Sequence, residues 1–443
     1  MTTPAPAASP ADPWPAPRVR HAVDTVVSLP GSKSLTNRAL VLASLASGPS
    51  VVRRALRSRD TLLMAGALTA LGARVDTSGE DWAVDPVAAG SPGGAGADAT
   101  VDCGLAGTVM RFVPPVAGLV EGRVAFDGDP HMRTRPIGTV LTALRDLGVT
   151  VEDEGRGALP FTVVGSGAVR GGEVVVDASA SSQFVSALLL AGARFEEGVE
   201  VRHQGGPIPS LPHVEMTTTV LRAHGVEVDD SVPDRWRVAP GPVRPVDHLI
   251  EPDLSNAGPF VALAAATGGT VVVRDWPATT TQAGDALRGI LTAMGCTVEM
   301  GAEGLRVTGP DRLSGVDLDL HDVGELTPVV AALCALADGP STLRGVAHIR
   351  HHETDRIAAL ATELAGLGAD VTETADGLVF RPAPLRAGVF HTYADHRMAH
   401  AGVVVGAVTD GVLVEDVATT AKTFPDFAGA WTAVTAEPGT AGA

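Results

Sequence analysis

Residues 30–48 read PGSKSLTNRALVLASLASG, a turn that is followed by a polar cluster and then by an apolar run. The Pro-Gly pair ends the extended stretch before it, and the apolar run predicts a helix. The polar residues therefore crowd the first turn of that helix, where free backbone N–H groups and the helix dipole favour an anion. Lys33 and Arg38 in this cluster predict that the anion is a phosphate or a carboxylate.

The same pattern recurs six times along the chain, which predicts an internal repeat. Each copy has a polar cluster, an apolar helix, a turn glycine and a strand rich in β-formers. A second helix follows, and in five copies it ends at a glycine that precedes another strand. The turn glycines lie 70–76 residues apart, at Gly48, Gly122, Gly198, Gly268, Gly339 and Gly411.

Each repeat, of about 70–75 residues, is too small to bury the faces of its own helices and strands. Three units per globule predict an α/β fold of two similar globules, with the first helices parallel inside each. The helix N-termini would then form two positive ends that face each other across a cleft and hold a polyanionic ligand.

The domain boundaries follow from the same pattern. Length alone favours about three domains, but we give more weight to the repeat, which favours two globules of three units each. We expect the boundary between the two globules in the proline-rich stretch 242–252. We also expect an opening strand near residues 19–29, which could pair with either globule. The predicted parts are a flexible tail at 1–17, one globule of 18–31 plus 251–435 (units 4–6), a second of 32–250 (units 1–3), and a flexible end at 436–443.

Composition limits the function classes. The 443 residues carry a formal net charge of −18, which argues against a nucleic-acid or anionic-membrane surface. No apolar run is long enough to cross a membrane, and the Ala/Pro-rich start does not read as a signal peptide. The three cysteines lie far apart in apolar or glycine-rich contexts, which predicts a reducing, cytoplasmic setting without disulfides.

Lys33 and Lys422 are the only lysines among 33 basic residues. An ammonium group is compact and can lose its proton when buried, whereas a guanidinium cannot. We interpret the two lysines as having a task that arginine cannot perform; chance survival is the alternative. The stretch around Lys33 is not a P-loop, because Ser32 instead of glycine precedes the lysine.

Further polar clusters stand at predicted helix starts, and each also has a plain structural reading. Arg135, before a proline, suits bidentate anion binding or a solvated capping loop. Residues 179–183 and Ser210 offer hydroxyls that could simply cap helices. Residues 351–356 pack histidines and acids together, but their spacing matches no closed zinc site, so no metal is expected. Glu353 could act as a proton donor or form a mere surface pair with Arg356.

Taken together, these clusters resemble the 5-enolpyruvylshikimate-3-phosphate synthase family of enolpyruvyl transferases. The resemblance covers about residues 19–431 in the family's order. The motifs are Pro30–Arg38, Ala106–Arg111, Ser181–Gln183, Glu353–Arg356, Asp395–Met398 and Ala421–Pro425. It implies two globules, each of three βαβαββ-type units, that close on ligand.

The resemblance also implies the reaction and its residues. Phosphoenolpyruvate would give its enolpyruvyl group to the 5-hydroxyl of shikimate 3-phosphate, with release of phosphate, in aromatic amino acid biosynthesis. Phosphoenolpyruvate would be held by Lys33, Gly107, Arg135, Gln183, Arg356, Arg397 and Lys422. Shikimate 3-phosphate would be held by Ser34, Arg38, Ser181, Ser182, Gln183, Ser210, Glu325 and His352. The implied catalytic residues are Lys33, Glu325, which takes the hydroxyl proton, and Glu353, which handles the proton at the methylene carbon.

No cofactor or metal is implied, and the partners are these two small molecules, with no nucleic acid, no membrane and a monomeric chain. Four positions depart from the common pattern of the family: Leu105 stands for Asn, Phe112 for Pro, Glu325 for Asp and His352 for Lys. Glu325 is one methylene longer than the usual aspartate, so its role as the base is open at this point. The contact of His352 with the ligand is also open, because it depends on the protonation of the ring.

Two alternatives belong to other classes. The sister enolpyruvyl transferase that acts on UDP-N-acetylglucosamine uses a loop cysteine, and residues 131–136 contain none. A non-catalytic, ligand-binding relative would be favoured by loss of Lys33, Glu325 or Glu353, and all three are present.

Overall fold

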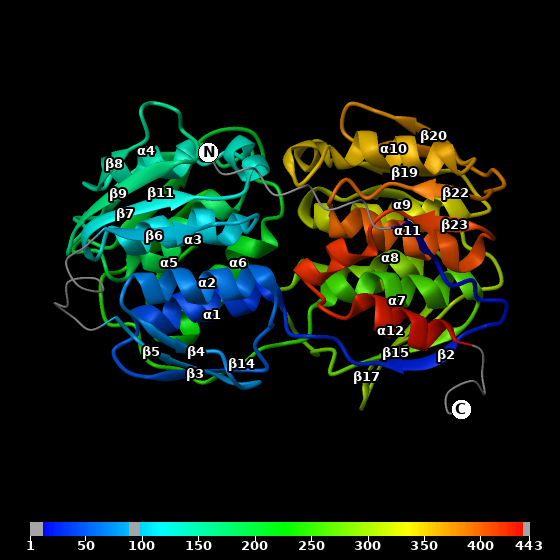
Figure 1. Ribbon diagram of the computed structural model, residues 1–443, viewed down its shortest axis with the longest axis horizontal. Helices are drawn as coiled ribbons and strands as arrows, with labels where there is room; N and C mark the ends of the chain where they lie inside the picture. The colour runs from blue at the N-terminus through cyan, green and yellow to red at the C-terminus, as the bar shows by residue number, and fades with distance from the viewer. Residues whose placement is uncertain (1–11, 88–97, 437–443) are drawn as a thin grey trace, which may run out of the picture.

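The computed structural model describes residues 12–87 and 98–436, which form two lobes side by side (Figure 1). Unit 2 shows the repeated architecture. Strand β6 pairs parallel with β7, and the hairpin β8–β9 adds antiparallel to β7, giving the sheet order β6-β7-β9-β8. The unit runs β6 (Ala99–Asp102), α3 (Gly107–Ala117), β7 (Glu121–Asp127), α4 (Gly138–Asp146), β8 (Thr150–Glu152) and β9 (Phe161–Ser166).

Units 3 and 5 repeat this βαβαββ order and the same sheet topology. Unit 3 consists of β10 (Gly172–Val176), α5 (Gln183–Gly192), β11 (Val199–His203), α6 (Pro212–Ala223), β12 (Val228–Asp229) and β13 (Arg235–Val238). Unit 5 consists of β18 (Asp317–Asp319), α9 (Thr327–Leu336), β19 (Ser341–Arg344), α10 (Arg356–Gly366), β20 (Asp370–Glu373) and β21 (Leu378–Arg381). Short 3-10 turns η3 (His321–Leu326) and η4 (Ala347–His351) precede its two helices.

Units 1 and 4 take their first strands from distant parts of the chain. The opening strand β2 (Asp24–Val27) pairs parallel with β15 of unit 4, and β14 (His248–Leu249) pairs parallel with β3 of unit 1. Unit 1 continues with α1 (Lys33–Leu45), β3 (Ser50–Arg53), α2 (Arg59–Ala70), β4 (Arg74–Asp76) and β5 (Trp82–Asp85). Unit 4 continues with α7 (Leu254–Thr267), β15 (Thr270–Arg274), η2 (Ala283–Ala286), α8 (Leu287–Ala293), β16 (Thr297–Gly301) and β17 (Gly304–Thr308).

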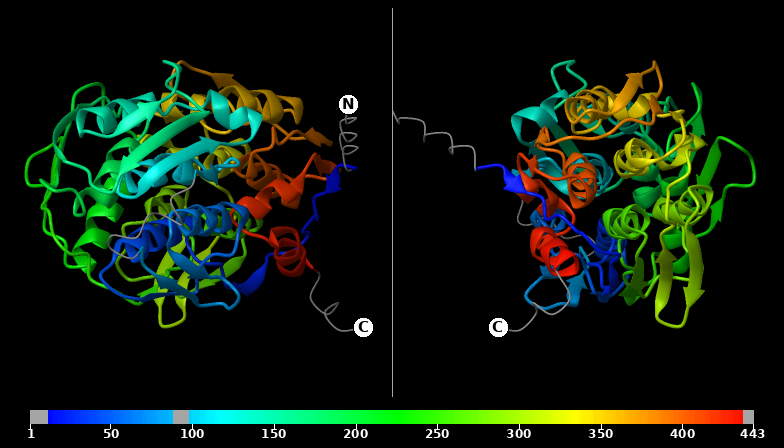
Figure 2. Two further views of the ribbon diagram at one scale, coloured as in Figure 1. Left: turned by 60° about the vertical axis from the view of Figure 1, so that its left-hand side comes forward. Right: turned by 90° about the vertical axis from the view of Figure 1, so that its right-hand side faces the viewer.

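Unit 6 is completed by the N-terminal end of the described chain. It comprises β22 (Gly388–Phe390), α11 (His396–Val408), β23 (Val412–Val414), η5 (Val417–Lys422) and α12 (Phe427–Thr435). In place of a second hairpin, β1 (Trp14–Pro15) pairs antiparallel with β23 (Figure 2). The prediction of a flexible tail over 1–17 is therefore wrong for Trp14–Pro15, because the edge of β23 offers backbone partners. The rest of that prediction before residue 12, and that for 437–443, lies outside the described residues.

Buried side chains form two hydrophobic clusters. One collects residues from Ala39 to Ile250, and the other collects Val19–Leu29 together with residues from Leu254 to Trp431. These clusters support the proposed division into a lobe of units 1–3 and a lobe of units 4–6, with the opening strand in the second. We keep the boundaries 18–31 plus 251–435 and 32–250 as a proposal.

The first helix of each unit lies inside its lobe. Helix α3 is buried along its whole length, and α11 is buried from His396 to Ala407. Such all-round burial suits the alanine, valine and glycine residues that both helices contain, because these small or compact side chains let neighbouring helices pack closely. Helices α7, α9 and α11 contact one another in one lobe, and α1, α3 and α5 do so in the other.

The chain crosses between the lobes twice, in neighbouring segments. The amide of Ser32 donates to the Glu251 carbonyl at 2.8 Å, and that of Asp253 donates to the Pro30 carbonyl at 2.9 Å. The Asp253 carboxylate accepts from the backbone amide of Lys33 at 3.2 Å and from that of Asn256 at 3.0 Å. One side chain therefore holds the N-termini of α1 and α7 together across the lobes.

Within the described ranges 12–87 and 98–436, none of the helices combines the length and apolar character needed to span a bilayer.

Candidate active site

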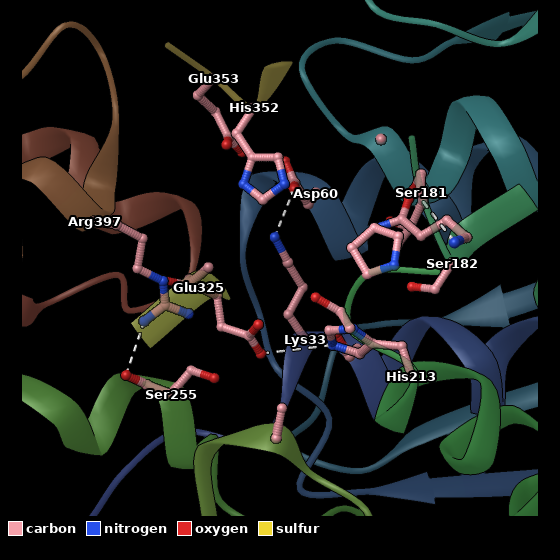
Figure 3. A pocket seen from close by; sticks show the side chains of 18 of the residues that line it. Lys33, Asp60, Ser181, Ser182, His213, Ser255, Glu325, His352, Glu353 and Arg397 are labelled. Carbon is pink, nitrogen blue, oxygen red and sulfur yellow. Dashed lines mark hydrogen bonds and ion pairs between the residues drawn. The ribbon is translucent and has the colours of Figure 1, made fainter. Parts of the chain in front are cut away.

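A cleft lined by both lobes receives the N-terminal ends of the six inner helices, and Figure 3 shows part of its lining. Lys33, Gly107 and Gln183 reach it from the starts of α1, α3 and α5 in the lobe of units 1–3. The other lobe supplies Ser255 from α7, Glu325 from just before α9, and Arg397 from α11. The predicted convergence of helix ends is confirmed, and it favours a bound anion.

The cleft brings together nearly all of the site residues that the sequence predicts. Its lining includes Lys33, Ser34, Gly107, Arg135, Ser181, Ser182, Gln183, Ser210, Glu325, His352, Glu353, Arg356, Arg397 and Lys422. Segments that are almost 400 residues apart in the chain, including the two that carry lysines, meet here. Five of these side chains are cationic, so the cleft is a local positive site in an acidic protein.

Arg38 is the exception, because it lies behind the lining. Its guanidinium is buried and donates to the Thr217 hydroxyl at 2.8 Å and to the carbonyl oxygens of His213 at 3.0 Å and Ser34 at 3.1 Å. Since Ser34 and His213 both line the cleft, Arg38 braces the wall there. A direct contact of Arg38 with ligand stays a prediction.

Lys33 is the first residue of α1, which is capped by the Ser32 hydroxyl. Its ammonium lies 3.4 Å from Asp60, a buried carboxylate on α2 that the sequence did not single out (Figure 3). Burial lowers the pKa of Lys33, and the nearby charge of Lys422 acts in the same direction, while Asp60 opposes them. Lys33 is therefore easier to deprotonate than an exposed lysine.

Glu353 lies among cations. The ammonium of Lys422 donates to one of its carboxylate oxygens at 2.5 Å, and Arg356 donates to the other at 3.1 Å. Burial acts to raise the pKa of Glu353, but the charges of Lys422, Arg356 and Arg135 prevail and hold it well below its usual range. The carboxylate is therefore ionised among these cations.

Asp395 fixes two of the arginines. Its fully buried carboxylate accepts from Arg356 Nε at 2.8 Å and from Arg356 Nη2 at 3.0 Å, a bidentate pair. The same carboxylate accepts from the backbone amide of Arg397 at 2.8 Å and so caps α11. The Arg397 guanidinium is held in turn by the Ser255 carbonyl at 2.8 Å (Figure 3).

Gly107 begins α3 beneath two guanidinium groups. A Cβ atom at this position would lie 3.0 Å from Arg111 Nη1 and 3.1 Å from Arg135 Nη1. Arg111 is buried and donates to the Gln183 side-chain oxygen at 2.8 Å. The missing side chain thus leaves backbone N–H groups and guanidinium groups around one small space, which suits a phosphate.

Four histidines line the cleft, and the sequence predicted only His352 among them. Arg356 Nη1 lies 3.0 Å from His352 Nδ1 and can only donate, so Nδ1 accepts and the neutral ring carries its proton on Nε2. Burial lowers the pKa of His352 well below its usual range, and Arg356 adds to this effect. The His352 ring is therefore a neutral hydrogen-bond donor, and it does not supply the positive charge of the lysine that is common at this position in the family.

His213 was missed by sequence reasoning. Its Nε2 atom lies 3.8 Å from Glu325 Oε1, so the pair spans the cleft from α6 to η3 (Figure 3). Burial lowers the pKa of His213, which Glu325 partly offsets. The only sequence signal for His213 was its position three residues after Ser210, which was already a candidate ligand of shikimate 3-phosphate. His348 also lines the cleft without a sequence signal, and His396 does so from within the motif Asp395–Met398, where no role was assigned to it.

Over residues 12–87 and 98–436, no group of three or more histidine, cysteine, aspartate or glutamate side chains is arranged to hold a metal ion.

Comparison with solved structures defines the class of the fold. The chain superimposes on an EPSP synthase from Acinetobacter baumannii with a TM-score of 0.79 and 23% identity, over 95% of this chain and 97% of that one. It superimposes on the enolpyruvyl transferase NikO from Streptomyces tendae with a TM-score of 0.73 and 18% identity, over 95% and 97% of the two chains. The fold is therefore that of the enolpyruvyl transferases, and the predicted fold class is confirmed.

The sequence comparisons narrow the class. Residues 17–431 match the family described as EPSP synthase (3-phosphoshikimate 1-carboxyvinyltransferase). A 3-phosphoshikimate 1-carboxyvinyltransferase of Kocuria rhizophila is 58% identical over 429 residues, which cover 95% of this chain and 96% of that protein. The chain belongs to the EPSP synthase family and is an enzyme that transfers an enolpyruvyl group.

Proposed function

We propose that this enzyme moves the enolpyruvyl group of phosphoenolpyruvate to the 5-hydroxyl of shikimate 3-phosphate and releases inorganic phosphate. One observation carries the proposal: six inner-helix N-termini and five cationic side chains face a single cleft between the lobes. Two phosphates and two carboxylates have to share the site, and fixed positive groups on both walls offset their mutual repulsion. Family membership supplies the identity of the two substrates.

The phosphoenolpyruvate subsite is assigned to the cationic end of the cleft. Its phosphate would lie near Gly107, where the guanidinium of Arg135 and the backbone of α3 converge. Its carboxylate would meet Arg356 and Arg397, which Asp395 orients. Lys33, Gln183 and Lys422 complete the proposed set.

The shikimate 3-phosphate subsite is assigned to the hydroxyl-rich wall of the lobe of units 1–3. Ser181, Ser182 and Ser210 line this wall, and Gln183 follows at the start of α5. Ser34 supplies a further hydroxyl from α1. From the opposite lobe, His352 would donate through Nε2–H and Glu325 would accept from the 5-hydroxyl.

The proposed reaction is an addition followed by an elimination, with protons conserved. Glu325 accepts the proton of the 5-hydroxyl while the oxygen bonds to C2 of phosphoenolpyruvate and a proton adds to the methylene carbon. The bond from C2 to the phosphate oxygen then breaks, the leaving phosphate takes up the proton held by Glu325, and the methyl group returns a proton to Glu353, which restores the double bond. Positive charge that develops at C2 is stabilised by a nearby carboxylate.

Glu353 is the proposed acid for the methylene carbon, so its pKa has to rise before it can donate a proton. The bound substrates bring phosphate and carboxylate charges close to Lys422, Arg356 and Arg135. These charges offset the cations that hold the pKa of Glu353 low, so substrate binding raises it toward the range of a proton donor.

The site favours shikimate 3-phosphate as the acceptor over UDP-N-acetylglucosamine, the acceptor of the sister transferase. Loop residues 131–136, which end at the cleft-lining Arg135, contain no cysteine. A purely ligand-binding role is disfavoured because Lys33, Glu325 and Glu353 all line the cleft. We further propose that the enzyme works as a cytoplasmic monomer without a cofactor.

The direct test measures phosphate release from phosphoenolpyruvate by the purified chain, with shikimate 3-phosphate, with UDP-N-acetylglucosamine, and with no acceptor. Release that requires shikimate 3-phosphate supports the proposal. Release only with the UDP-sugar would assign the sister activity, and binding of phosphoenolpyruvate without release under any condition would assign a non-catalytic role.

A further inference from the structure

The segment between β22 and α11, residues 391–395, is held in an unusual backbone conformation next to the cleft. Tyr393 and Ala394 have φ angles of 54° and 55°, and two consecutive left-handed residues other than glycine are uncommon. The segment ends at Asp395, which orients Arg356 and caps α11. Something has to keep the strained backbone in place for Asp395 to keep its position.

Glu363 supplies the restraint. This buried carboxylate accepts three hydrogen bonds from the segment: from the Tyr393 hydroxyl at 2.6 Å, from the His391 amide at 2.9 Å and from His391 Nδ1 at 2.9 Å. Glu415, after β23, adds a contact from the Thr392 amide at 2.9 Å. Glu363 itself lines no part of the cleft.

The arrangement fastens the segment to one helix at two points. Arg356 and Glu363 both belong to α10 and stand seven residues apart, which is two helical turns on one face. Arg356 holds the segment at Asp395, and Glu363 holds it at Tyr393 and His391. Without the hydrogen bonds to Glu363, the left-handed residues could relax, and Asp395 would then shift relative to Arg356.

We propose that Glu363 and Tyr393 are positioning residues that hold Asp395, and through it Arg356 and Arg397, in the geometry that binds phosphoenolpyruvate. The inference rests on the proposed function, because it takes Arg356 and Arg397 as phosphoenolpyruvate ligands. It predicts a larger effect on phosphoenolpyruvate than on shikimate 3-phosphate, because the serine ligands proposed for shikimate 3-phosphate stand on the opposite wall, whereas His352 is bonded to Arg356 and would pass on part of any shift. Tyr393 can serve as a donor at any working pH, because burial and the bond to Glu363 raise its pKa to about 12.

The first test is Tyr393→Phe, which removes one hydroxyl from a side chain that is 42% exposed and so leaves the core intact. We expect the KM for phosphoenolpyruvate to rise about tenfold, as for loss of a hydrogen bond to a charged group. The KM for shikimate 3-phosphate should change clearly less than that for phosphoenolpyruvate, and the melting temperature should stay near the wild-type value. Thr308→Val is the matched control, because it removes a hydroxyl that pairs with Thr270 at 3.0 Å in a sheet of the same lobe.

A graded pair of variants tests the second residue. Glu363→Gln keeps an acceptor for Tyr393, so its KM for phosphoenolpyruvate should lie between those of the wild type and Glu363→Ala. Unchanged constants in Tyr393→Phe would overturn the proposal, and so would equal losses for both substrates, which indicate general damage to the fold. Absence of phosphate release by the wild-type chain would instead refute the proposed function.

Discussion

Lys33 and Lys422 come from different lobes and opposite ends of the sequence, yet both line the cleft. Lys33 lies beside Asp60 and Lys422 contacts Glu353, so each ammonium has its own carboxylate partner. Neighbouring positive charges and burial make it easier for Lys33 to give up its proton. The rarity of lysine in this chain was therefore a useful sequence signal.

The prediction for Lys33→Arg follows from this setting. The guanidinium keeps its charge but is broader and cannot be deprotonated, so we expect turnover to fall by about 100-fold or more while the fold is retained. Initial rates of phosphate release and thermal melting would measure the two effects. Arg312→Lys, at a side chain that is 83% exposed, is the control. Turnover within tenfold of the wild type would contradict the special role of the ammonium.

Gly107 gives a second prediction for a single residue. An alanine Cβ would press on the ends of Arg111 and Arg135, which can move, so the fold should tolerate it. The shifted guanidinium groups would weaken phosphate binding, and we expect the KM for phosphoenolpyruvate to rise about tenfold or more. Gly66→Ala on α2 is the matched control, because no atom of the described residues lies within 4 Å of its Cβ position. An unchanged KM in Gly107→Ala would argue against a phosphate site there.

The sequence predicted residues whose chemistry is written into local clusters and missed those whose role depends on a distant partner. Ser181, Ser182 and Gln183 stand together at a helix start, where the cluster alone could be a simple cap, and the family resemblance supplied the prediction that they bind ligand. His213 gains its meaning only from Glu325, which belongs to the other lobe. Such a pairing is a property of the tertiary structure, and a single sequence holds no record of it.

At the level of elements, the repeat predicted the six units and the inner helices because helical periodicity is local. The sequence grouped residues 18–31 with units 4–6, but it could not fix the strand with which this segment pairs. Residues 24–27 form a four-residue strand, and a strand that short fits the edge of many sheets. Its parallel pairing with β15, more than 240 residues later, is decided by which edge is vacant after folding.

The N-terminal strand β1 carries the prediction for an element. Trp14 packs against the core of units 4–6, and its strand covers an edge of β23. A chain that begins at residue 16 should unfold more easily than one that begins at residue 12, by about 1–3 kcal/mol for the lost side-chain burial. Urea unfolding of the two truncations would measure the difference. Coincident unfolding curves would show that β1 contributes no stability.

For the whole molecule, buried histidines predict acid sensitivity. Burial lowers the pKa of seven of them, to about 4 for His248 and His348. The others are His213, His224, His352, His396 and His400. Below about pH 6.5 the unfolded chain binds protons that the folded chain refuses, so stability falls as the pH drops toward 4. A fully buried histidine adds a slope of up to about 1.4 kcal/mol per pH unit.

Chemical denaturation at pH 8, 6.5 and 5 would measure this slope. His400→Phe is an informative variant, because the His400 ring is buried 4.7 Å from that of Phe427 and neither of its nitrogens has a hydrogen-bond partner in the described chain. It should leave stability at pH 8 unchanged or higher and should flatten the dependence on acid. Equal stability of the wild type at pH 8 and pH 5 would show that the buried imidazoles do become protonated in the fold.

The two crossings between the lobes run antiparallel and are hydrogen-bonded to each other at residues 30–32 and 251–253. A single connection would let one lobe rotate freely relative to the other. Two connections that are hydrogen-bonded to each other resist this rotation, so bending out of the plane of the pair is the easiest relative motion of the lobes. The same topology makes residues 32–250 a continuous insert whose entry and exit lie side by side. A short graft from Pro30 to Pro252 would therefore excise that half and leave the remainder as one unbroken polypeptide.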